Sequence, residues 1–123
     1  MGTARRRKPN CTALQKAVRV AEDNEWGPRT DKACSIVNHA SGGQFPFGVK
    51  ITQDVVNAYV DGWWGPASKR ATRESVMEVQ EALTAMGFDT QGIDGIWGPN
   101  TQEAFYEARD SHYPYDPPEP PDD

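Results

Sequence analysis

The fold of this chain follows from the stretch Ile93-Asp94-Gly95-Ile96-Trp97-Gly98-Pro99-Asn100-Thr101-Gln102-Glu103-Ala104. Asp-Gly favours a tight turn, because glycine adopts a positive φ angle without steric cost. Gly98-Pro99 marks a helix start, since proline at the first helical position gives up no hydrogen bond. Trp97 lies between turn and helix, where a large apolar ring can anchor the connection to the core. The stretch therefore predicts a turn that leads directly into a helix.

The same pattern occurs twice more upstream. The two other copies are Trp26-Gly27-Pro28-Arg29-Thr30-Asp31-Lys32-Ala33 and Trp64-Gly65-Pro66-Ala67-Ser68-Lys69-Arg70-Ala71, and all three fit Trp-Gly-Pro-x-Thr/Ser-x-x-Ala. Gln15 and Gln53 each lie eleven residues before their tryptophan, whereas Gln80 lies seventeen before Trp97, so the third copy carries six extra residues near 86–92. One helical hairpin cannot cover its own apolar face, so the copies should pack into a single core.

Apolar residues recur at helical spacing and predict an all-α fold, a small helical bundle of about three helix-turn-helix repeats. The expected helices cover about 12–21, 28–40, 51–60, a short segment from Pro66, a segment restarting at Thr72 or Ser75 and closing at Gly87, and 99–111. The copies thus span about 12–40, 51–73 and 75–111 of a helical repeat domain at 11–112. Residues 1–10 are expected to form a flexible, disordered basic arm, and 113–123 a disordered, acidic, proline-rich tail.

Charge and hydropathy exclude several classes of protein. The net charge is −5, and an acidic body argues against nucleic acid as the main partner, because phosphate binding needs a basic surface. No apolar run approaches about 18 residues, so membrane insertion is not expected. No apolar stretch follows the basic head, so we expect no conventional secretory signal. We therefore expect the protein to be made in the cytoplasm.

The sequence shows no catalytic or metal-binding constellation. His39 and His112 are far apart and lack a short ligand spacing, so neither a metal nor another cofactor is expected. No triad or paired-carboxylate context is recognisable, which predicts a protein that is not an enzyme. Cys11 and Cys34 flank the first copy, and the sequence is equally compatible with a disulfide and with free thiols.

The third copy also carries a longer series of motif residues, which comprises Val79-Gln80, Leu83, Gly87-Phe88, Asp94-Gly95, Trp97-Gly98, Thr101 and Ala104. From about 75 to 109 it resembles the peptidoglycan-binding domain family, the small three-helix type found on cell-wall hydrolases and bacteriophage endolysins. The other two copies resemble it less, because they lack the Gly-Phe segment.

The resemblance implies a non-catalytic module that binds peptidoglycan at the bacterial cell wall, encoded by a phage or associated with a lysin. The alternative is a phage virion structural or assembly protein that uses this fold as a docking platform, with a lysin or phage structural proteins as partners. A small-ligand binder is a weaker third hypothesis. The candidate ligand-binding residues lie near the third turn, with one further candidate in the second copy: Asp94, Gly95, Ile96, Trp97, Thr101 and Trp63.

Most of these residues also have a structural interpretation. Trp26, Trp64 and Trp97 are expected first as core anchors, because a repeated fold needs a repeated anchor. The turn aspartates are expected to cap their own turns, and the Thr or Ser of the first helical turn to hydrogen-bond the preceding loop. Trp63 differs, since Glu25 and Ile96 occupy its position in the other copies, and burial and exposure are equally expected for it.

Overall fold

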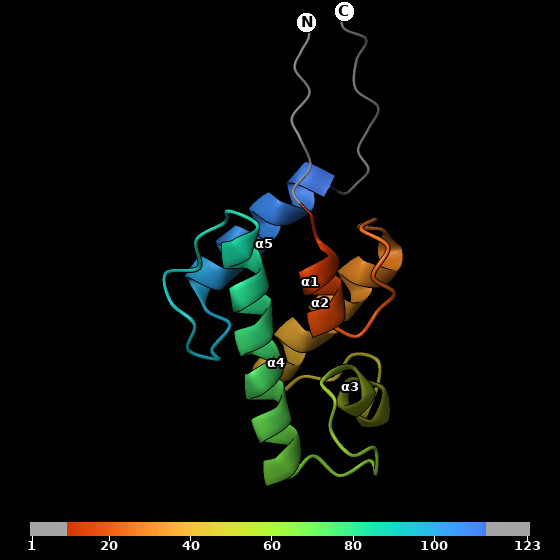
Figure 1. Cartoon of the computed structure of the whole chain (residues 1–123). Helices are drawn as coiled ribbons and strands as arrows, with labels where there is room; N and C mark the ends of the chain where they lie inside the picture. The colour runs from red at the N-terminus through yellow and green to blue at the C-terminus, as the bar shows by residue number, and fades with distance from the viewer. Residues whose placement is uncertain (1–9, 113–123) are drawn as a thin grey trace, which may run out of the picture.

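The computed structural model describes residues 10–112, and this part of the chain folds into five helices without a strand (Figure 1). The helices are α1 (Thr12–Ala17), α2 (Pro28–Ser41), α3 (Val49–Val55), α4 (Pro66–Ala85) and α5 (Pro99–His112). The prediction of an all-α bundle is therefore confirmed. The predicted acidic tail, and all but the last residue of the basic arm, lie outside the described residues.

The longest helix, α4, belongs to two copies of the repeat. It begins at Pro66 of the second copy and also carries Gln80 of the third. The prediction that one helix ends and another restarts at Thr72 or Ser75 is wrong, because no glycine or proline interrupts the segment that follows Pro66. The hydroxyls of Thr72 and Ser75 instead donate to backbone carbonyls, at 2.9 and 3.2 Å. Helix α4 contacts α1, α2 and α5, and α3 packs on α2 (Figure 1).

The short helices α1 and α3 end earlier than predicted, after Ala17 and Val55 rather than near Ala21 and Val60. Each ends in a Schellman motif, in which the residue after the C-cap adopts a left-handed conformation and frees the chain to turn. Helix α4 ends in the same way at Gly87, which was predicted as the end of this helix. The residues with positive φ are Arg19 (64°), Asn57 (66°) and Gly87 (99°).

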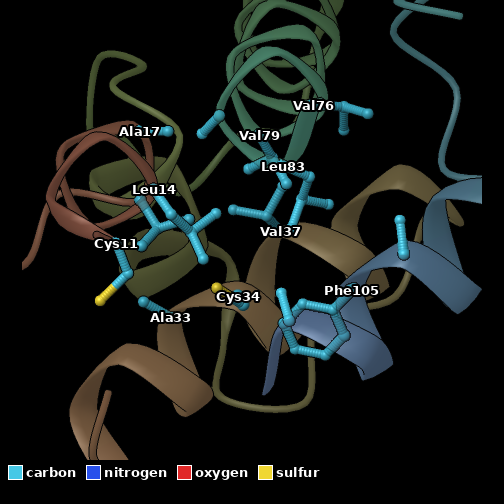
Figure 2. Packing of buried hydrophobic residues seen from close by; sticks show 14 of the residues in the cluster. Cys11, Leu14, Ala17, Ala33, Cys34, Val37, Val76, Val79, Leu83 and Phe105 are labelled. Carbon is cyan, nitrogen blue, oxygen red and sulfur yellow. The ribbon is translucent and has the colours of Figure 1, made fainter. Parts of the chain in front are cut away.

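Buried side chains from α1, α2, α4 and α5 form one core (Figure 2). The first and third copies share an aromatic contact there, because the rings of Trp26 and Trp97 each lie with their centroids 5.5 Å from Phe105. Trp64 packs instead on Phe45 from the loop after α2, with a centroid distance of 4.6 Å. Trp26 is buried and the other two tryptophans are partly buried against the core, which confirms their predicted anchoring role.

Both cysteines are buried in this core as free thiols (Figure 2). Burial raises the pKa of Cys11 to about 11, with a further contribution from the charge of Asp23. Burial likewise raises the pKa of Cys34. The thiols therefore stay protonated at neutral pH.

Candidate functional site

A buried glutamine amide holds the turn of the third repeat. Gln80 Nε2 donates to Asp94 Oδ1 at 3.0 Å, to the Ile96 carbonyl at 3.0 Å and to Thr101 Oγ1 at 2.9 Å. Gln80 Oε1 accepts a hydrogen bond from the backbone N–H of Gly95 at 3.0 Å. One side chain on α4 thus ties together both sides of the turn and the first turn of α5.

The same network occurs in the other two repeats. Gln15 Nε2 donates to Asp23 Oδ1 (2.9 Å), the Glu25 carbonyl (3.0 Å) and Thr30 Oγ1 (3.2 Å). Gln53 Nε2 donates to Asp61 Oδ1 (3.0 Å), the Trp63 carbonyl (2.9 Å) and Ser68 Oγ (3.0 Å). We call this arrangement the glutamine lock; it explains why Gln, Asp and Thr or Ser recur in every copy.

The turn aspartates do cap their turns, as predicted. Each Oδ1 also accepts the backbone N–H two residues later, at 2.9 to 3.0 Å. These backbone hydrogen bonds, with the glutamine amides second, hold the pKa of each carboxyl below its ordinary value, and Arg73 adds to the effect at the third turn. The residue after each aspartate has a positive φ angle: Asn24 (62°), Gly62 (83°) and Gly95 (78°).

Two predicted ligand-binding residues lie inside the repeat. The Thr101 side chain is 2% exposed and accepts the lock hydrogen bond. Gly95 is also buried, and a Cβ atom there would lie 2.5 Å from Arg73 Cγ, so the close approach of α4 requires glycine. These residues shape the turn from within.

The other predicted residues lie at the surface or beside it. Asp94 is exposed, and Ile96 is 64% exposed at the tip of the third turn. Trp97 is partly buried, and its indole Nε1 donates to Gln102 Oε1 at 2.6 Å. Trp63 is 68% exposed and belongs to the second turn. The predicted set therefore divides into a group at the third turn and a separate tryptophan.

A groove of about 330 Å³ lies between the third turn and the second repeat. Its residues come from the end of α2 and the loop after it, from the second Trp-Gly-Pro segment and α4, and from the third turn: Ala40, Ser41, Gly43, Trp64, Lys69, Thr72, Arg73, Gly95 and Ile96. Sequence reasoning placed Gly95 and Ile96 at the site and missed the others. The third turn is tied to the end of α2 by a hydrogen bond from the Trp97 N–H to Ser41 Oγ, at 3.4 Å.

The groove carries positive charge on an acidic protein. Lys69 and Arg73 both line it, and they are one helical turn apart on α4. Asp94 precedes Gly95 in the third turn and adds a negative charge close to the groove, and the Arg73 charge contributes to its lowered pKa. Locally, the groove can attract an anion even though the whole chain has a net charge of −5.

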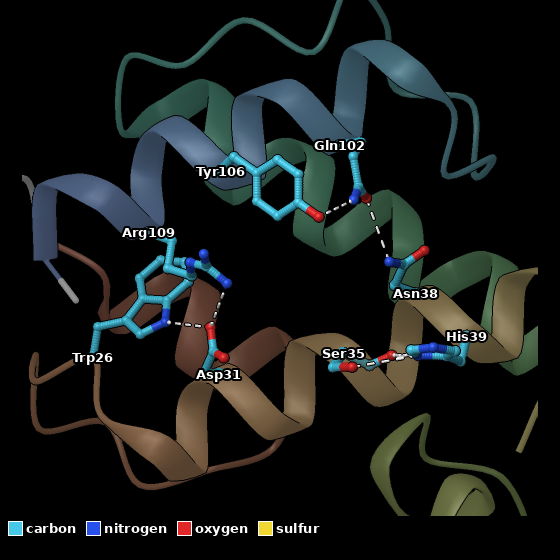
Figure 3. Close-up of polar contacts among 8 residues, drawn as sticks. All are labelled: Trp26, Asp31, Ser35, Asn38, His39, Gln102, Tyr106 and Arg109. Carbon is cyan, nitrogen blue, oxygen red and sulfur yellow. Dashed lines mark hydrogen bonds and ion pairs between the residues drawn. The ribbon is translucent and has the colours of Figure 1, made fainter. Parts of the chain in front are cut away.

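Comparison of the repeats shows that Lys69 is specific to the second copy. In the first copy the indole Nε1 of Trp26 donates to Asp31 Oδ1 at 3.4 Å (Figure 3), and in the third copy Gln102 is the acceptor. Lys69 occupies the corresponding position, five residues after Trp64, and has no acceptor atom. Within the described residues, the Trp64 indole donates no hydrogen bond to the protein. Aligning the copies would have revealed this substitution.

Within residues 10–112, no group of three or more His, Cys, Asp or Glu side chains is arranged to hold a metal ion. In the same range, every helix is too short or too polar to cross a membrane.

Residues 72–106 match the family model described as a putative peptidoglycan binding domain. The match covers most of α4, the longer third loop and the first half of α5, and it confirms the resemblance for this segment of the chain. Comparisons with curated proteins and with solved structures gave no match. The matched segment is therefore that of a binding domain, generally non-catalytic in itself, and points to the cell wall.

Proposed function

We propose that this protein is not an enzyme and binds peptidoglycan through the groove between the second and third repeats. The observation that carries this proposal is that the segment matching a peptidoglycan-binding domain supplies Arg73, Gly95 and Ile96 to the groove. The proposed site therefore comprises the third turn, which includes Asp94, and the residues of α4 that line the groove.

The chemistry of the groove suits a stem peptide, which carries carboxylates. The Arg73 guanidinium can bind a carboxylate through two parallel hydrogen bonds, and Lys69 adds a second charge one turn away. Trp64 and Ile96 supply apolar surface for the methyl and aliphatic parts of the peptide. The groove thus combines apolar walls with a few polar groups that fix orientation.

The experiment is a sedimentation assay of the full chain with purified peptidoglycan sacculi. We expect the wild-type protein to be retained and the double variant Lys69→Ala, Arg73→Ala to bind at least about tenfold more weakly, since each lost charged contact is worth that much. Arg29→Ala, Arg70→Ala is the matched control, because both residues are exposed, lie outside the groove and remove the same charge. Equal losses in both double variants, or no retention of the wild type, would refute the proposal.

We further propose that this chain associates with a lysin or a phage particle. It is supported by the resemblance to modules found on cell-wall hydrolases and endolysins. A lysin partner should comigrate with this chain in size-exclusion chromatography and should need it for retention on sacculi. If this chain binds sacculi but no lysin needs it for retention, the proposal of binding through the groove stands and the proposal of a lysin partner is wrong.

A further inference from the structure

The second repeat exposes large apolar side chains that the first repeat lacks. Ile51, Tyr59, Val60 and Trp63 are exposed, with Tyr59 at 81% and Trp63 at 68%. The corresponding residues of the first copy are Ala13, Ala21, Glu22 and Glu25. Because the first copy forms the same glutamine lock without them, the fold does not require apolar residues at these positions. Their presence calls for a role outside folding.

The ring of Trp63 lies flat on the backbone of Gly65. A Cβ atom at Gly65 would lie 2.5 Å from Cη2, 2.5 Å from Cζ3 and 2.9 Å from Cε3 of that ring. A point this close to three consecutive ring atoms lies over the face of the ring rather than at its edge. The backbone therefore covers one face of the indole, and the exposed fraction of Trp63 belongs largely to the other face.

This geometry is confined to the second repeat. No atom lies within 4 Å of a Cβ position at Gly27 or Gly98, the glycines of the other two Trp-Gly-Pro segments. The main chain of Trp63 is also fixed, because its N–H donates to Asp61 Oδ1 at 2.9 Å and its carbonyl accepts from Gln53 Nε2 at 2.9 Å. An aromatic ring held in this way loses little conformational entropy when a ligand stacks on it.

Polar groups lie at the same turn as Trp63. Asp61 is exposed, and the Lys50 side chain reaches the turn, with Cε 3.3 Å from a Cβ position at Gly62. A turn that carries a flat aromatic face, a carboxylate and an ammonium suits a pyranose ring, whose apolar C–H face is surrounded by hydroxyls. The apolar C–H face can stack on the indole, and the hydroxyls can hydrogen-bond to the charged groups.

We infer that Trp63 is a stacking platform for a sugar ring of the glycan strand, with Asp61 and Lys50 as hydrogen-bonding partners. This inference rests on the proposed function and adds a second contact to it. Trp63 is adjacent in the chain to Trp64, which lines the groove. A sugar on Trp63 and a stem peptide in the groove would therefore contact consecutive residues of the chain, and the two are covalently linked in peptidoglycan.

The test uses the full chain with two probes, intact sacculi and glycan strands from which the stem peptides have been removed. We expect the wild type to bind the peptide-free strands, and Trp63→Ala to bind them about tenfold more weakly or worse, as for a central tryptophan contact. Gly65→Ala should give a similar loss, because the added Cβ displaces the ring. Gly27→Ala and Gly98→Ala are matched controls that should bind normally, and thermal unfolding confirms that each variant is folded.

The outcomes separate this inference from the proposed function. If retention on sacculi depends on Lys69 and Arg73 but is unchanged in Trp63→Ala, the inference of a stacking platform is wrong and the proposed groove site stands. Binding of peptide-free strands that depends on Trp63, without any effect of the two groove cations on sacculi, supports the platform and overturns the groove. If Trp63→Ala changes the sedimentation coefficient of the protein rather than glycan binding, this surface is a protein interface and the inference is wrong.

Discussion

Replacing Gln80 by leucine tests the buried amide that organises the third repeat. The side chain is 1% exposed and takes part in four hydrogen bonds, to Asp94, Ile96, Thr101 and Gly95. The amide has two N–H hydrogens for its three acceptors, so at about 1 kcal/mol net for each of two donated bonds and one accepted bond the loss would cost about 3 kcal/mol. The exposed carboxylate can rehydrate, so we expect about 2 kcal/mol of lost unfolding free energy. That is a large share of the roughly 5–15 kcal/mol that stabilises a typical domain.

The assay is urea unfolding of the full chain, followed by circular dichroism. Gln44→Leu is the matched control, because Gln44 is exposed and surface substitutions change stability by less than about 0.5 kcal/mol. Gln80→Glu adds a sharper test, since it keeps the shape but turns the donor into an acceptor that faces the Asp94 carboxylate. Repulsion raises the pKa of the introduced carboxyl in the folded state, so this variant should lose stability as the pH rises towards neutral.

A loss below about 1 kcal/mol in Gln80→Leu, or a loss no larger than that of Gln44→Leu, would refute the lock as the source of stability in this repeat. The same would follow if Gln80→Glu were as stable as the wild type at neutral pH.

Three further predictions follow from the turn and the core. Because the pKa of Asp94 is lowered in the folded state, its contribution to the free energy of unfolding is complete above the ordinary value of 3.8 and is lost as the pH falls through the lower folded value. Asp94→Asn keeps both acceptor contacts, so it should reduce this acid sensitivity in urea titrations at several pH values. Cys11 and Cys34 should react with a thiol reagent only on unfolding, so labelling of the native protein as fast as that of the denatured chain would contradict their burial. Gly95→Ala should cost about 2 kcal/mol or more, because of its positive φ angle and the side chain beneath it, whereas Gly98→Ala should be nearly neutral by thermal unfolding.

The repeat was predictable because its signals are local. Gly-Pro after an aromatic residue places the start of α2, α4 and α5 at the residues where the structure has them. The division of α4 was mispredicted because Ser75 and Glu78 have the spacing of a capping box. In the folded chain Ser75 is buried within α4 and donates to the Val56 carbonyl, so tertiary packing overrides the local pattern.

The site was predictable only on the side that the motif supplies. Gly95 and Ile96 belong to the turn, and the pattern that marks the turn identifies them. Ser41, Lys69 and Arg73 reach the groove because α2 and α4 pack against that turn, and no local pattern in the sequence states which helices will meet. Lys69 could have been predicted in a different way, since aligning the copies shows a cation where the others have a hydrogen-bond acceptor.

The three copies act as internal controls for one another, and the second copy departs from the solution that the other two share. In the first copy the anchor is fully occupied: Trp26 packs on α5 and donates to Asp31, which also forms an ion pair with Arg109 at 3.8 Å (Figure 3). Among the described residues, the indole of the second copy lacks the corresponding hydrogen bond, worth about 1 kcal/mol, and this copy places a cation in the groove instead. Such a local departure from an otherwise repeated solution is expected where binding rather than stability determines the residue.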